Sequence, residues 1–122
     1  MPLHAISWFE IAVTDLDRAA AFYGAILDTT LDRMELGSPA AVFPADQENG
    51  VGGALILDGT EPSENGALVY LETEGRLQEV LDRVEGAGGE VVLGFTEIGS
   101  GYGDYALIKD TEGNRVGLFQ SP

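Results

Sequence analysis

Apolar and polar residues alternate near the start of the chain. The alternating apolar positions are Phe9, Ile11 and Val13, and a period of two residues is typical of a strand with one buried face. The pattern therefore predicts a strand over residues 3–13. Because neighbouring side chains of a strand point to opposite faces, Trp8 and Glu10 are expected on the face turned away from the helix that follows.

The spacing then changes to that of a helix. Asp15 carries a short carboxylate that can accept a hydrogen bond from the free N–H groups of a first helical turn. An apolar stripe with the spacing i, i+3, i+4 and i+7 follows it, made of Ala19, Phe22, Tyr23 and Ile26. We predict a helix over residues 15–27.

A weaker copy of this strand and helix recurs 58 residues later. Thr73 occupies the position of Asp15 in the copy. The apolar stripe is repeated by Leu77, Val80, Leu81 and Val84. A second helix is predicted over residues 74–85, and the glycines of Gly86-Ala-Gly-Gly89 are typical of its C-terminal end.

The rest of each half contains short apolar runs separated by glycine, proline and polar turns. In the first half, further strands are predicted over residues 30–36, 40–45 and 52–57. In the second half, strands are predicted over residues 67–72, 90–97, 104–109 and 115–120. Each half then has the order βαβββ. We predict a single α+β domain over residues 1–122, with one module at about 3–57, a linker at 58–66 and a second module at about 67–120. Its two sheets are expected to pair into a concave mixed sheet with the helices outside.

The charge of the chain limits the kinds of molecule that it is expected to bind. The chain has 21 acidic and 6 basic residues, a formal net charge of −15. Nucleic-acid binding is not expected, because it needs a basic surface. The acidic surface either steers a cationic small molecule or only keeps the protein soluble.

Several other classes of site are not expected. The chain has no cysteine, which excludes disulfides and thiolate sites. No apolar run approaches the roughly 18 residues of a membrane span. The N-terminal residues lack the features of a secretory signal, so a cytoplasmic location is the default expectation.

Three segments carry a resemblance to a known family. They are FEIAVTDLDRAAAFYGAIL at 9–27, GAGGEV at 86–91 and DTEGNRVGLF at 110–119. With these segments the chain resembles the vicinal oxygen chelate superfamily, which includes glyoxalase I, extradiol dioxygenases and bleomycin-resistance proteins. Trp8-Phe9-Glu10 resembles the first strand of a bacterial glyoxalase-related subgroup. Thr111 departs from the family pattern, which usually has proline there. The resemblance implies tandem βαβββ modules, a ligand site on the concave face and a homodimer.

The resemblance also implies where a metal would bind. Metal-dependent members usually place His, Glu or Gln on the first and last strands of each module. Here these positions fall at Trp8, within residues 52–55, at Gly66 or Leu68, and at Gly117, and none is a metal ligand. The only histidine, His4, lies near the chain end. We therefore expect no metal and no other cofactor.

The candidate site is an apolar, aromatic pocket with one or two acids, the usual make-up of a small-molecule site. Its candidate ligand-binding residues are Trp8, Glu10, Tyr70, Glu72, Phe95, Tyr102 and Tyr105. Glu10 is the candidate catalytic base, since partial burial on the inner face would raise its pKa. The alternative is that Glu10 bonds to a structural partner or lies in water at an open rim. The loop 99–103 is a candidate lid.

Three functions remain open from the sequence. The first is a metal-free protein that binds a small organic molecule, similar to the bleomycin-resistance proteins. The second is a lyase, isomerase or dioxygenase-like enzyme that works through Glu10 or builds a shifted metal site from Glu10, Glu72 and others. The third is an accessory domain without a ligand.

Overall fold

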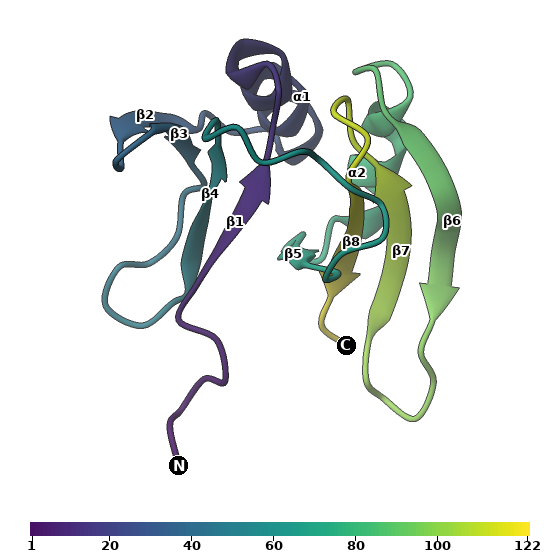
Figure 1. The fold of residues 1–122 in the computed structure, drawn as a ribbon. Coiled ribbons are helices and arrows are strands. Elements are labelled where there is room, and N and C mark those ends of the chain that lie inside the picture. The colour runs from purple at the N-terminus through teal and green to yellow at the C-terminus, as the bar shows by residue number, and fades with distance from the viewer.

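The computed structural model describes residues 1–122 and contains two βαβββ modules (Figure 1). The first module consists of β1 (Trp8–Ala12), α1 (Leu16–Leu27), β2 (Asp32–Glu35), β3 (Pro39–Val42) and β4 (Gly52–Ile56). The second consists of β5 (Tyr70–Glu72), α2 (Leu77–Val84), β6 (Glu90–Glu97), β7 (Asp104–Lys109) and β8 (Arg115–Gln120). The α+β class and the duplicated order are thus confirmed. Neither helix combines the length and the apolar character needed to cross a membrane.

Each module forms its own four-stranded mixed sheet. The strand orders are β1-β4-β3-β2 and β5-β8-β7-β6. In both sheets the first strand runs parallel to the last one, and the other pairs are antiparallel. The register pairs Trp8 with Gly52 and Tyr70 with Gly117. No hydrogen-bonded pairing joins β1 to β5, so each of them is an edge strand with one unpaired side.

The two helices lie between the two sheets (Figure 1). α1 packs on β3 and β4, α2 packs on β6, β7 and β8, and the helices pack on each other. One apolar core of 20 buried residues joins both modules around them. This differs from the expected paired sheet with the helices outside. The buried residues of α1 form one broad apolar stripe, and the helix packs on its own sheet and on α2 at once. The other face of each sheet therefore points away from the core.

The start of α1 follows the sequence pattern and that of α2 does not. The carboxylate of Asp15 caps α1 by accepting from the N–H of Arg18 at 3.0 Å, as predicted. α2 begins three residues later than predicted, because Glu74 and Gly75 have φ angles of 53° and 79° and cannot belong to a right-handed helix. The Thr73 hydroxyl donates to a backbone carbonyl of β8 and does not cap α2.

Two strands, β1 and β5, begin three or more residues later than predicted. β1 begins at Trp8 because β4, its only partner, begins at Gly52, directly opposite. Residues 3–7 have no strand to pair with and extend away from the fold (Figure 1). In the second module, β5 begins only at Tyr70, opposite Gly117 of β8. Short strands at both inner edges leave room between the modules.

Candidate functional site

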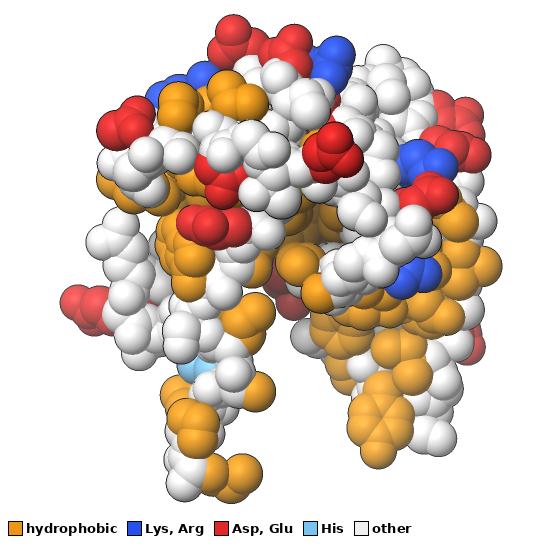
Figure 2. Space-filling view, in the orientation of Figure 1, with side chains coloured by type: hydrophobic (Ala, Val, Ile, Leu, Met, Phe, Trp, Pro, Cys, Tyr) orange, Lys and Arg blue, Asp and Glu red, His pale blue; other side chains and the backbone are white.

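A cavity of about 730 Å³ lies between the two modules. Figure 2 shows a hollow between the two sheets with hydrophobic side chains along its sides. Its lining comes from both modules: β1, the C-terminal end of α1, the β3–β4 connection, β5 and the start of α2. Most of the lining side chains are hydrophobic, and they include Ile6, Phe9, Leu27, Phe43, Val69, Leu71 and Val80.

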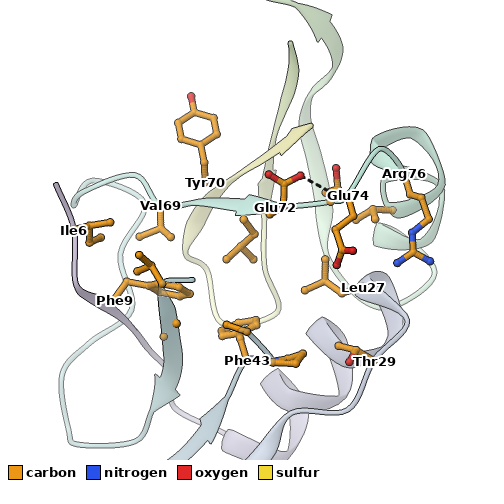
Figure 3. Close-up of a pocket in the computed structure, with 18 of the residues that line it drawn as sticks. Ile6, Phe9, Leu27, Thr29, Phe43, Val69, Tyr70, Glu72, Glu74 and Arg76 are labelled. Carbon is orange, nitrogen blue, oxygen red and sulfur yellow. Dashed lines mark hydrogen bonds between the residues drawn. The ribbon is translucent and has the colours of Figure 1, made fainter. Parts of the chain in front are cut away.

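The walls of the cavity are built by the faces of the sheets that carry the core. Phe9 of β1 and Phe43, just after β3, have ring centroids 5.6 Å apart, tilted by 41°. A Cβ atom on Gly53 would clash with the ring of Phe9, so this glycine lets the ring lie flat against β4. Val69 and Leu27 face these rings from the second module and from α1 (Figure 3). The result is an apolar interior next to the core.

Charged residues lie at one end of the cavity. Asp28, Glu72, Glu74 and Arg76 all line it. The carboxylate of Glu72 accepts from the backbone N–H of Glu74 at 2.9 Å. The side chain of Glu74 forms no hydrogen bond or ion pair within the chain, and Figure 3 shows its carboxylate pointing towards Leu27. Arg76 also has no carboxylate partner. The charges of Glu74 and Arg76 are therefore not neutralised by an ion pair within the chain.

The opposite side of the module interface is closed by the turn between β7 and β8. The carboxylate of Glu112 reaches across to the N-terminus of α1. It accepts from the backbone N–H groups of Thr14 and Asp15, both at 2.9 Å, and from Arg18 at 2.7 Å. Burial by itself raises the pKa of Glu112, but these hydrogen bonds outweigh it and lower the pKa from 4.5 to about 2.

The same turn makes two further contacts with the first module. The Tyr23 hydroxyl donates to the buried carboxylate of Asp110 at 2.6 Å, and burial together with this carboxylate raises the pKa of Tyr23 well above 10.0. The Asn114 amide donates to the carbonyl of Ala12 at 2.8 Å. These contacts between the modules were not predicted from the sequence. The only signal was that these residues form part of the family-like DTEGN segment.

The predicted site residues of the first strand lie on the outward face of their sheet. Trp8 is 43% exposed, and its indole N–H donates to the carboxylate of Glu10 at 3.3 Å. Glu10 is itself exposed. The partial burial expected to prepare it as a base is therefore absent in the single chain, because nothing covers this face of β1.

The predicted residues of the second module lie on the outward face of the other sheet or at its far end. Tyr70 and Tyr105 pack edge to face at 6.2 Å, and Tyr70 points away from the cavity (Figure 3). Phe95 of β6 is exposed, and Tyr102, in the β6–β7 loop, is 68% exposed. Of the seven predicted residues only Tyr70 and Glu72 border the cavity, and Tyr70 does so without turning its ring into it. The loop 99–103 does not border the cavity, and neither does His4.

The positions where a family metal would bind carry no donors. Trp8 and Gly52 face each other on neighbouring strands of the first sheet, and Tyr70 and Gly117 do so in the second. In each pair the aromatic ring lies against the glycine, where an added Cβ would meet it. No three His, Cys, Asp or Glu side chains converge elsewhere in the chain in a way that could hold a metal ion. The donor set does not fit a metal at the family positions.

Comparisons with known proteins agree with this architecture. A family model described as Glyoxalase/Bleomycin resistance protein/Dioxygenase superfamily matches residues 5–118. A glyoxalase/bleomycin resistance protein from Albidiferax ferrireducens has a similar structure, with a TM-score of 0.78 at 16% identity, covering 96% of this chain and 99% of that one.

Two other solved structures are also similar. A glyoxalase-related enzyme from Fulvimarina pelagi gives a TM-score of 0.68 at 16% identity over 98% of this chain and 90% of that one. A genomically encoded fosfomycin resistance protein from Listeria monocytogenes gives 0.68 at 15% identity over 99% and 96%. No curated protein sequence matches the chain. At these identities the likeness to solved structures concerns the fold alone.

Proposed function

Because the chain belongs to the Glyoxalase/Bleomycin resistance protein/Dioxygenase superfamily, we propose that it binds a small organic molecule in the cavity between its two modules. The observation that carries the proposal is the cavity itself, about 730 Å³ with mainly apolar walls and a few charged groups at one end. Sites for small molecules commonly have this size and make-up. The site is therefore proposed on the core side of the sheets, away from Trp8 and Glu10.

A neutral dye tests this binding site. Nile red fluoresces strongly in apolar surroundings, and we expect one molecule to bind per chain. Val69 points into the cavity (Figure 3), so Val69→Trp should fill it and abolish binding. Val92→Trp, on the exposed surface of β6, is the matched control and should bind as the parent does. Absence of a fluorescence rise, or an equal loss in both variants, contradicts the proposal.

We propose that this binding needs no metal ion, since the family positions lack donor atoms. The competing function is an enzyme with a shifted metal site. Glu10 and Glu72 lie in different sheets and are not part of any converging group of ligands. The metal content of the protein after incubation with nickel, zinc, manganese or iron(II), together with the melting temperature, decides between the two. A stoichiometric ion with a raised melting temperature would overturn the metal-free proposal, because an ion bound to the native state stabilises it.

We further propose that two copies of the chain form a homodimer through their inner edge strands. β1 and β5 each have an unpaired side. The outer edges are protected instead: β2 is exposed and mostly charged, and β6 contains register irregularities. The outward faces of β1 and β5 carry exposed apolar side chains, namely those of Trp8 and Tyr70. Exposed apolar groups beside open edges are typical of a surface that a partner covers.

The oligomeric state in solution tests the dimer. Light scattering coupled to size exclusion should give twice the chain mass of 12.9 kDa at micromolar concentration. Trp8→Glu places a charge on the exposed part of the proposed interface and should shift the protein to monomer while keeping its circular dichroism spectrum. A monomeric parent protein contradicts the proposal.

A further inference from the structure

We propose that the cavity selects an amphipathic organic cation, an apolar body that carries one ammonium group, with Glu74 as the anchor for the charge. This inference rests on the proposed function, because it names the class of ligand for the same cavity. It follows from the apolar walls and from the charges at one end of them.

The interior of the cavity suits the apolar body of such a ligand. Phe9, Phe43 and Val69 are among the hydrophobic side chains that make up most of its lining. An alkyl or aryl group buried there gains roughly 25 cal/mol for each Å² of apolar surface removed from water. A polar or charged group in the same place would lose its hydration without a partner. The charged part of the ligand must therefore lie at the end where the charged residues are.

The charges at that end favour a cation. Three of the four charged lining residues are carboxylates, from Asp28, Glu72 and Glu74. Glu72 already accepts a hydrogen bond from the chain, whereas the carboxylate of Glu74 has no partner and points towards Leu27 at the apolar interior (Figure 3). An ammonium group beside Glu74 forms a charge-assisted hydrogen bond while its body contacts Leu27.

Arg76 is the residue that would hold an anion instead. It is exposed, and it is the only cation among the lining residues. An anion bound to Arg76 would lie among three carboxylates, in a chain with a net charge of −15. The summed field of these charges repels an anion and attracts a cation. Arg76 can remain directed to solvent when a cation is bound, because its long side chain is not fixed by any ion pair.

Three probes with one tail and different head groups test the ligand class. Octylammonium, 1-octanol and octanoate are titrated into the protein at neutral pH by calorimetry. We expect octylammonium to bind most tightly and octanoate most weakly. Glu74→Gln should weaken octylammonium binding about two- to fivefold, as expected for one exposed charge pair, and leave octanol binding unchanged. Glu35→Gln removes the same charge from exposed β2 and should change the affinity less than about twofold.

The outcomes separate this inference from the proposed function. If Nile red and octanol bind, and Val69→Trp blocks both, but octanoate binds as tightly as octylammonium or Glu74→Gln has no effect, the cation class is wrong and the cavity site stands. If neither Nile red nor any octyl probe binds, the proposed function itself fails. Equal effects of Glu74→Gln and Glu35→Gln would show that only the overall charge matters, which also contradicts an anchor at Glu74.

Discussion

Replacing Glu112 by glutamine should weaken the attachment between the two modules. The substitution keeps the shape of the side chain and removes its charge. The carboxylate is fully buried and accepts hydrogen bonds from Thr14, Asp15 and Arg18 of the first module. Glutamine can accept with only one oxygen, and its amide N–H groups would face the donors of Arg18. We therefore expect a loss of stability without a change of fold.

The size of the loss follows from the pKa of Glu112. Hydrogen bonds lower it from 4.5 to about 2 against the opposing effect of burial. At about 1.4 kcal/mol for each pH unit, this corresponds to roughly 3 kcal/mol of unfolding free energy at neutral pH. Arg18 is 51% exposed, so water weakens its share of the interaction. We expect Glu112→Gln to cost roughly 2–3 kcal/mol.

The pH dependence of the unfolding free energy gives an independent check on the contribution of Glu112. Because the pKa of Glu112 is lower in the folded state, its ionised form stabilises the fold above about pH 4.5, and this contribution is lost as the pH falls towards 2. Urea unfolding followed by circular dichroism at pH 7 and pH 3 measures it. The difference in unfolding free energy between parent and variant should be less than half as large at pH 3 as at pH 7. Glu35→Gln should show almost no difference at either pH. A cost below about 1 kcal/mol at pH 7, or an equal cost at both pH values, would show that the charge of Glu112 does not hold the modules together.

Two further predictions concern packing and a buried hydrogen bond. Gly53→Ala should cost roughly 1–3 kcal/mol, because the new methyl group meets the packed ring of Phe9. Gly117→Ala should cost less, since the ring that it meets, Tyr70, is 48% exposed and can turn away; equal losses of melting temperature would contradict this. Tyr23→Phe removes one donor from a buried carboxylate and should cost roughly 1–3 kcal/mol by urea unfolding, whereas an unchanged midpoint would show that the carboxylate is satisfied without Tyr23.

The elements could be predicted because their signals are local. Alternation at Phe9, Ile11 and Val13 indicates a strand, and Asp15 before an apolar stripe indicates a helix start. The failures have two different causes, a strand partner distant in sequence and an unusual local backbone. The start of β1 is set by Gly52 on β4. The start of α2 is set by backbone angles at Glu74 that no propensity predicts.

The site was harder to predict than the fold, because it depends on how the modules pack. Strand alternation correctly assigned Trp8 and Tyr70 to the faces away from the helices. It could not show that the helices lie between the sheets, which turns those faces outward. The cavity instead uses Phe9, which alternation assigns to the core, and Phe43, whose facing the sequence pattern left open. On the opposite side of the interface, Glu112 binds Thr14, which is 98 positions away in the sequence. No local sequence pattern can indicate a contact over that separation.

The cavity between the modules is tested most directly by locating a bound molecule on the protein. Methyl groups of leucine and valine can be followed by nuclear magnetic resonance while octylammonium is added. If the ligand binds between the modules, the methyl signals of Leu27, Val69 and Val80 should shift and saturate together. Shifts confined to Val92 and Leu93 on the exposed surface of β6, with the cavity methyl groups unchanged, would contradict the claim that the cavity is the binding site.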